Sequence, residues 1–365
     1  EPGAWAVPGV RAVVTGRDFP FSFGASIQDQ PFLAVDRVRF AGEPVAAVAA
    51  DTELQAQEAC RLIEVRYEAL PEVLDPCAAA EPGAPLLHPG LEGYRRGGHQ
   101  IEPGTNICVV ARFAHGDVAA AMAQADVVVA GQYTAHAVSH AALEPHCAIA
   151  RYEEATGACT VWTSSDRPFQ LRDEIAAALG VPGRSVRVVV GQVGGSFGGR
   201  NTLVAEAPAL ALARFAGGRA VRVELSREED LAASQMRMPA IIRLTTGVGR
   251  DGTLLARKAE ILWDGGAYAS NAVGIAIRGP KAVFGPYRIP HIAYESRMVY
   301  SNKQPTGSYR GYGTTQAAWA CESHMDEIAA RLGLDPVAFR LQNAYGEGDP
   351  WHNGQILHGM AIAET

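Results

Sequence analysis

The amino-acid sequence predicts an α+β fold divided into more than one domain. Short β-rich runs alternate with amphipathic helical patterns along most of the chain. Hydrophobic residues make up 48% and charged residues 19%, a balance that supports packed cores and excludes disorder as the main state. The chain has 365 residues, a length at which a single core usually splits into two or more domains.

The first segment, from Gly9 to Leu70, is predicted to be a small α+β unit. Strands are expected over residues 10–15, 37–40, 45–49 and 65–67. A helix is expected over residues 51–64, because Thr52 and Gln55 have the spacing of a capping box. One apolar stripe along this helix consists of Ala56, Ala59, Cys60 and Ile63.

A connector rich in proline, glycine and alanine follows over residues 71–104, and we place the domain boundary near His88. Beyond it, helical and strand patterns alternate again. Helices are expected over residues 117–124, 169–179, 203–215 and 317–332. Strands are expected over residues 126–133, 158–164, 185–190 and 220–225.

Composition excludes several classes of function. The formal net charge is −7, which argues against a nucleic-acid partner. No stretch reaches the roughly 18 consecutive apolar residues of a membrane helix. The six cysteines include no Cys-x-x-Cys pair, so neither an iron–sulfur cluster nor a zinc site is expected within the chain. The first residue is Glu1, so a segment upstream is expected.

A glycine-rich segment at residues 191–200 is the strongest candidate for a binding loop. It follows a β run and precedes a helical pattern, where main-chain amides favour an anion or an oxo group. A Rossmann fingerprint needs glycines two positions apart, and this segment has none. A phosphate-binding P-loop would place lysine and serine or threonine where Arg200 and Asn201 stand, so a nucleotide-binding enzyme remains only as an alternative.

A second candidate segment covers residues 305–316 and leads into the last predicted helix. Arg310 lies there among glycines and between Tyr309 and Tyr312. A guanidinium held stiffly in this way can bind a carboxylate, a carbonyl or a developing oxyanion. The two aromatic rings could form a flat slot for a planar substrate.

Together these segments resemble the molybdenum hydroxylase family, which includes xanthine dehydrogenase and aldehyde oxidase. Residues 29–76 look like its α/β hammerhead domain. The first half of its molybdopterin-binding region is similar to residues 140–146, 194–199 and 309–313. The resemblance implies a hammerhead domain over residues 1–87, truncated at its N-terminus. It further implies a first molybdopterin-binding domain over residues 88–365, without the second one.

The resemblance implies cofactor-binding roles for six residues. The amides around Phe197 and Gly198 would lie against the oxo group of the molybdenum and the ring system of the cofactor. Asp166 stands where the family commonly has a glutamine near the labile oxygen of the metal. The implied cofactor-binding residues are Asp166, Gly195, Phe197, Gly198, Gly199 and Arg310.

The resemblance also implies residues for substrate binding and catalysis. Arg278 matches a substrate-facing arginine of the purine-oxidising members and would stabilise negative charge during the reaction, beside Arg310. Tyr312 occupies the place of a phenylalanine that stacks on the substrate ring. Asn201 stands where the purine oxidisers have a substrate-binding glutamate, so specificity for xanthine itself is weakened.

The function implied is molybdenum-dependent hydroxylation of an aromatic heterocycle, purine-like, or of an aldehyde, with water as the oxygen source. Electrons would pass to iron–sulfur and FAD groups on partner subunits or domains. The cofactor would be molybdenum-molybdopterin, in its cytosine dinucleotide form if the protein is bacterial. We expect a cytoplasmic heteromer that forms a homodimer.

The catalytic base of the family is a glutamate far downstream of the arginine loop, and no substitute for it is found among the residues up to Thr365, so this chain alone is predicted to be inactive. A cofactor-free scaffold of the same fold remains an alternative. Asp166 and Asn201 are the departures from the family pattern that favour it.

Overall fold

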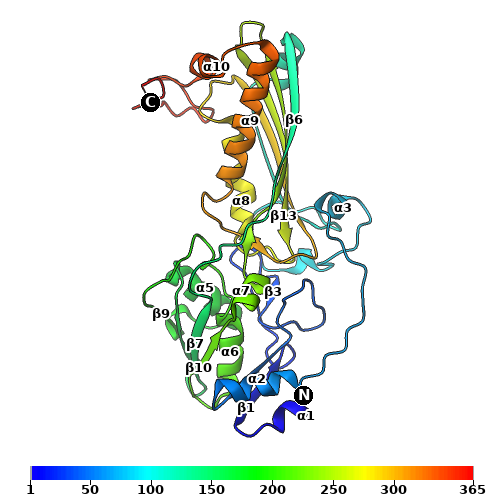
Figure 1. Cartoon of the computed structure of the whole chain (residues 1–365), viewed down its shortest axis with the longest axis vertical. Helices are drawn as coiled ribbons and strands as arrows, with labels where there is room; N and C mark the ends of the chain where they lie inside the picture. The colour runs from blue at the N-terminus through cyan, green and yellow to red at the C-terminus, as the bar shows by residue number, and fades with distance from the viewer. Residues whose placement is uncertain (1, 365) are drawn as a thin grey trace.

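The computed structural model describes residues 2–364 and shows an elongated molecule with two lobes, with the two chain ends at opposite ends of the long axis (Figure 1). The first lobe is built on a four-stranded sheet and carries the N-terminal segment. The second lobe is built on a long five-stranded sheet. Both contain helices and strands, so the predicted α+β fold class is confirmed.

The first lobe combines the N-terminal hairpin with a sheet from the middle of the chain. The strands of this sheet are, in spatial order, β10 (Val221–Glu224), β7 (Cys147–Glu153), β8 (Ala158–Thr163) and β9 (Val186–Val190). The packed helices are α5 (Pro168–Leu179), α6 (Glu206–Phe215) and α7 (Arg227–Ala233). The N-terminal elements are α1 (Pro2–Trp5), β1 (Val10–Thr15), β2 (Ser22–Phe23), β3 (Gln30–Pro31), β4 (Ala46–Ala50) and α2 (Glu53–Arg61).

The second lobe consists of a curved sheet with helix α9 (Thr314–Leu332) along one face (Figure 1). Its strands are, in spatial order, β5 (Ile107–His115), β14 (His291–Tyr300), β13 (Leu254–Gly266), β12 (Ala240–Val248) and β6 (Val127–Ala135). Within this sheet, only β13 and β14 pair in parallel. The remaining elements of the two lobes, in chain order, are α3 (Pro76–Ala80), η1 (Leu91–Gly93), α4 (Val118–Gln124), η2 (Gly183–Ser185), β11 (Met236–Arg237), α8 (Ala272–Arg278), η3 (Gly279–Phe284), β15 (Thr306–Gly307) and α10 (Pro336–Asn343).

Two large hydrophobic cores stabilise the lobes, and neither coincides with one stretch of sequence. Val14, Phe23 and Phe32 of the N-terminal segment share a core with Ile175 and Leu210 of the middle of the chain. The other core contains residues of the connector together with the long sheet and α9. The hammerhead segment is therefore packed against part of the following region, and the division at residues 87 and 88 stays a prediction.

Several predicted elements are confirmed, and two predicted strands are wrong. The capping box of Thr52 and Gln55 is present, and helices α4, α5 and α9 lie where apolar periodicity predicts them. Residues 37–40 and 65–67 are not strands. The first of these turns so that Arg39 donates to Leu87 O, and the second is exposed without a neighbouring strand. The six cysteines are free thiols.

Within residues 2–364, no helix is both long and apolar enough to cross a membrane.

Candidate active site

The two segments singled out from the sequence lie in direct contact between the lobes. The main-chain amide of Arg310 donates to the carbonyl oxygen of Phe197 at 3.0 Å. Gly198 has a φ of 99°, and a Cβ there would lie 2.8 Å from the carbonyl oxygen of Ser308. Only glycine permits this approach of the two backbones. The glycine loop and the arginine loop thus form one continuous wall.

Unusual backbone conformations gather around this wall. Among residues 2–364, four residues other than glycine have positive φ: Ala141 at 44°, Phe197 at 52°, Ser270 at 43° and Tyr312 at 51°. Each such conformation costs on the order of 1–3 kcal/mol and persists only where surrounding contacts impose it. Because strained backbone of this kind is concentrated at functional sites, the cluster supports a site at this wall.

Arg200 fixes the glycine loop from behind. Its side chain is almost fully buried and donates to Gly195 O at 2.7 Å and to Ser164 Oγ at 2.6 Å. It also donates to the carbonyl oxygens of Glu144 and Pro145. One guanidinium therefore joins the loop to the end of β8 and to the segment before β7. Its planar fork of donors suits this better than a lysine ammonium would.

A buried amide network supports the arginine loop from the other side. Asn271 accepts the main-chain amide of Ser308 at 2.7 Å and donates to the side-chain oxygens of Asn201 and Gln235. The side chain of Gln235 in turn donates to Ser270 Oγ. Asn201 is 4% exposed, so the structure places this predicted substrate-binding residue under the wall rather than on its surface.

Tyr312 is anchored at both ends. Its hydroxyl donates to Asn271 O at 3.0 Å, and its ring lies against Gly274 of α8, where a Cβ would overlap the hydroxyl oxygen. Arg278 lies one turn further along the same helix and is exposed. Arg310 is also exposed. Residues four apart share a helix face, so Arg278 lies on the side of α8 that faces Tyr312.

Asp166 lies at the edge of the glycine loop and is held by it. Its Oδ2 accepts from Ser196 Oγ at 2.6 Å, and its main-chain amide donates to Arg200 O at 3.2 Å. The Ser196 hydroxyl oxygen also accepts the amide of Gly198 at 3.2 Å. The amides of Ser196 and Phe197 have no acceptor among residues 2–364.

The histidines before β7 form a structural network. The ring nitrogens of His140 lie 2.7 Å from Ser308 O and 3.0 Å from Gln235 O, and burial lowers its pKa. His146 pairs with Asp230 of α7 and reaches the carbonyl oxygen of Gly199. The pairing with His146 lowers the pKa of Asp230 against the effect of burial. No group of metal-ligating side chains is found in the described part of the chain.

One expectation about the glycine loop is wrong. Helix α6 begins at Glu206 and not at residue 203, so the loop does not open directly into a helix. Residues 201–205 instead run through the buried network, with Asn201 and Thr202 nearly inaccessible to solvent. The loop amides therefore lack the helix N-terminus that a phosphate-binding loop uses, and the nucleotide-binding alternative loses its basis.

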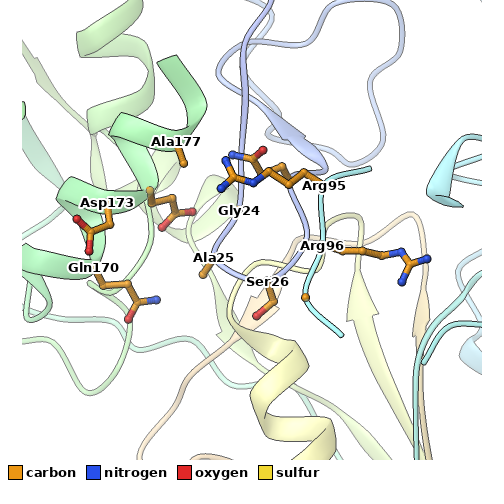
Figure 2. Close-up of a pocket in the computed structure, with 11 residues that line it drawn as sticks. Gly24, Ala25, Ser26, Arg95, Arg96, Gln170, Asp173 and Ala177 are labelled. Carbon is orange, nitrogen blue, oxygen red and sulfur yellow. The ribbon is translucent and has the colours of Figure 1, made fainter. Parts of the chain in front are cut away.

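A separate cavity of about 430 Å³ lies beside α5, and neither Phe197 nor Arg310 is among its lining residues. It is lined by the turn at Gly24–Ser26, by residues 95–97 and by Gln170, Asp173 and Glu174 of α5. Figure 2 shows Arg95 extending toward the helix with Asp173 and Ala177, whereas Arg96 points away. Gln170 connects this cavity to the start of α5, because its Oε1 accepts from Arg167 Nη1 at 2.9 Å.

Comparison with known proteins decides the family. Residues 99–344 match the family described as molybdopterin cofactor-binding domain, and residues 2–71 match the hammerhead domain of aldehyde oxidase and xanthine dehydrogenase. The chain belongs to the molybdenum hydroxylase family. It is 34% identical to the nicotinate dehydrogenase large molybdopterin subunit of Eubacterium barkeri over 99% of this chain and 82% of that subunit.

Other members of the molybdenum hydroxylase family are longer than this chain. It is 35% identical to a probable xanthine dehydrogenase subunit of Bacillus subtilis, covering 97% of this chain and 45% of that one. The aldehyde oxidoreductase of Desulfovibrio gigas superposes with a TM-score of 0.88 at 28% identity, over 99% of this chain and 40% of that one. Quinoline 2-oxidoreductase of Pseudomonas putida 86 gives a TM-score of 0.83 at 30% identity, over 98% of this chain and 46% of that one.

The wall has the chemistry that a molybdenum hydroxylase cofactor requires. At Gly198 and Gly199 a Cβ would collide with Ser308 and His140, so these glycines let the loop pack closely against its neighbours and hold its main-chain amides in place. The unpaired amides of Ser196 and Phe197 can donate to an oxo or ring acceptor. The residues present therefore fit a pterin-bound oxo metal.

Sequence reasoning does not find the residues that hold this wall in place. In the sequence, Arg200 is only a departure from a P-loop, and nothing singles out Asn271 or Gln235. Apart from Gly195, which is five residues before Arg200, their partners lie 35 to 70 residues away in the chain, so no local pattern identifies them. One local feature does point to Arg200: an arginine directly follows Gly198 and Gly199. In a tight loop this position is buried, so its side chain needs acceptors inside the protein.

Proposed function

We propose that this chain forms one wall of a molybdenum hydroxylase active site that hydroxylates an aromatic heterocycle or an aldehyde. The observation that carries the proposal is the hydrogen bond from Arg310 N to Phe197 O, which joins the cofactor loop to the substrate loop. When bound, the molybdopterin cofactor would accept two electrons from the substrate carbon, with water as the source of the oxygen. The name of one relative, a large molybdopterin subunit, supports a heteromeric assembly. We propose that the partners carry the iron–sulfur and FAD groups and that a bacterial protein would hold the cytosine dinucleotide form of the cofactor.

The chain's own residues would bind and orient the substrate. The ring of Tyr312, fixed by Asn271 and Gly274, offers a flat face for a planar substrate. The exposed guanidinium groups of Arg278 and Arg310 would stabilise negative charge that develops on the substrate. Asn201 would act through Asn271, because its side chain is buried beneath the wall. Gly195, Phe197, Gly198, Gly199 and Asp166 would form the cofactor side.

The described residues include no candidate for the catalytic base. Asp166 is bound to Ser196, and Glu144 accepts from Gly194 N and lies 3.7 Å from Arg200. A base must be free to take a proton from the attacking oxygen. We therefore propose that the chain on its own turns over no substrate. We further propose that the protein is part of a cytoplasmic heteromer and that this chain consists of two domains, at residues 1–87 and 88–365.

The test is an oxygen-labelling experiment on the purified holoenzyme with its partner subunits. A panel of N-heterocycles and aldehydes is incubated in water enriched in oxygen-18, and products are analysed by mass spectrometry. The proposal predicts a hydroxylated product that carries the label from water. A product labelled from molecular oxygen contradicts it, as does absence of product from a molybdenum-loaded enzyme. A folded complex without molybdenum would support the cofactor-free scaffold instead.

A further inference from the structure

We propose that the cavity beside α5 binds a small zwitterion of the amino-acid class, with its ammonium group on Glu174 and its carboxylate on Arg95. This cavity is separate from the proposed active site, because neither Phe197 nor Arg310 is among its lining residues. Neither the sequence motifs nor the family resemblance assigns a ligand to it.

Glu174 is the residue that points to a ligand. It is only 6% exposed, and neither of its carboxylate oxygens has a hydrogen-bond partner among residues 2–364. A buried carboxyl group without a partner destabilises a protein, and native structures contain few such groups. A ligand that donates hydrogen bonds to these oxygens would satisfy them.

Helix α5 presents Glu174 to the cavity. The helix residues that line the cavity have spacings of three and four and so share one face: Gln170, Asp173, Glu174 and Ala177. Gln170 Oε1 accepts from Arg167 Nη1 at 2.9 Å, and Asp173 Oδ1 accepts from Arg172 Nε at 2.8 Å. Glu174 is therefore the acidic group on this face that lacks a donor from the described residues.

Two other segments of the chain form the opposite wall. Residues 24–28 and 95–97 lie side by side, since Gln28 N donates to Arg95 O at 2.9 Å and Gly97 N donates to Ser26 O at 3.0 Å. These bonds fix the backbone on both sides of the Arg95 side chain. Figure 2 shows Arg95 extending toward α5. Arg95 and Glu174 line the same cavity from opposite walls, and no hydrogen bond joins them.

The charges on the two walls determine the class of ligand. Glu174 can accept hydrogen bonds from an ammonium group, and Arg95 can bind a carboxylate through two parallel hydrogen bonds. A simple amine would bring an unbalanced cation close to Arg95, and a simple acid would bring an anion close to Glu174. A zwitterion meets both charges. The cavity volume of about 430 Å³ lies in the range of small-molecule sites.

Binding of an ammonium group would also change the protonation of Glu174. Burial raises the pKa of Glu174 to about 8, and the negative charges of Glu206 and Asp29 act in the same direction. The other charged residues that line the cavity are Asp173, Arg95 and Arg96. At pH 7 the carboxyl group is therefore mostly protonated, and an adjacent ammonium group lowers its pKa. The carboxyl proton would pass to the buffer, so binding should release about one proton per ligand.

The test is calorimetry on the purified holoenzyme with ω-amino acids of increasing chain length, beginning with glycine. Each amino acid is compared with the amine and the carboxylic acid of the same length. The variants are Glu174→Gln and Arg95→Gln, and the matched controls are Glu58→Gln and Arg61→Gln, at exposed positions of α2. Titrations in two buffers of different ionisation enthalpy give the number of protons released. Calorimetry requires no turnover, so the result does not depend on the proposed hydroxylation.

We expect an amino acid of one chain length to bind wild-type enzyme about ten-fold more tightly than its amine or its acid, with release of about one proton at pH 7. Glu174→Gln should weaken binding about ten-fold and abolish the proton release, Arg95→Gln should weaken binding and keep the proton release, and the controls should behave as wild type. Absence of binding by every amino acid would overturn the proposal. Equal binding of the amine alone would overturn it too, as would unchanged affinity in Glu174→Gln.

Discussion

The main-chain amide of Arg310 donates to the carbonyl oxygen of Phe197, and this bond joins two loops that are far apart in the sequence. It connects residue 197 of the segment after β9 with residue 310 of the segment after β15. Both loops also carry a non-glycine residue at positive φ, Phe197 and Tyr312. The contact between the two loops therefore depends on individual residues. Single substitutions that leave the rest of the fold intact can test it.

Gly198→Ala should separate the two loops. The added Cβ would lie 2.8 Å from Ser308 O, and the φ of 99° is unfavourable for alanine. We expect bound pterin, measured by fluorescence after release and oxidation, to fall about ten-fold. Gly191→Ala, in the same loop with open space around it, should retain the wild-type amount. Equal pterin content in both variants would contradict the proposed close approach.

Arg200→Gln should destabilise the protein and loosen the loop. The shorter side chain leaves the partly buried carbonyl oxygens of Gly195, Glu144 and Pro145 without their donor. An unsatisfied buried polar group costs about 1–3 kcal/mol. Thermal unfolding should show a lower Tm, whereas Arg184→Gln, at an exposed position, should have no effect. Unchanged Tm in Arg200→Gln would show that its hydrogen bonds are not stabilising.

Glu174→Gln should change how stability depends on pH. Burial raises the pKa of Glu174 to about 8, and the negative charge of Glu206 acts in the same direction. A carboxyl group with a raised pKa in the folded state stabilises the protein at low pH, and this stability is lost as pH rises from about 4.5 to 8. Glutamine does not titrate, so the variant avoids that loss.

The expected result is that the free energy of unfolding of Glu174→Gln, relative to wild type, rises by about 1–3 kcal/mol between pH 5 and pH 8. Denaturant titrations at the two pH values measure this difference. Glu58→Gln, on the exposed side of α2, should show no such change. A difference between variant and wild type that is the same at pH 5 and pH 8 would exclude a protonated Glu174.

Tyr312→Phe should remove the hydrogen bond that holds the ring of Tyr312 in place. The hydroxyl donates to Asn271 O at 3.0 Å, and a typical buried hydrogen bond contributes about 0.5–1.5 kcal/mol. Because the ring and its contact with Gly274 remain, we expect a small loss of stability and a raised KM with kcat nearly unchanged. Gly274→Ala should have the larger effect, since its Cβ would displace the ring. Steady-state kinetics of the holoenzyme distinguish the two.

The parts of the fold that the sequence predicts are those with local signals. Helices α4, α5 and α9 have apolar periodicity of their own, and Thr52 with Gln55 caps α2 as expected. Residues 37–40 and 65–67 have strand-like composition, but a strand exists only where a partner lies beside it. Helix α6 starts late because Asn201 and Thr202 are engaged in the network beneath the wall.

The residues of the candidate site likewise fall into those that the sequence predicts and those that it does not. Glycine density identifies residues 194–199, and the aromatic setting identifies Arg310, because both are features of neighbouring residues. Arg200, Gln235 and Asn271 act through contacts with distant segments, so the chain order does not reveal them.

The most direct measurement of the central claim is the molybdenum content of the holoprotein purified from cells that make the cofactor. If the glycine loop and the arginine loop form one wall of a molybdenum hydroxylase site, elemental analysis should find about one molybdenum atom per chain. A correctly folded complex that contains essentially no molybdenum would contradict the account.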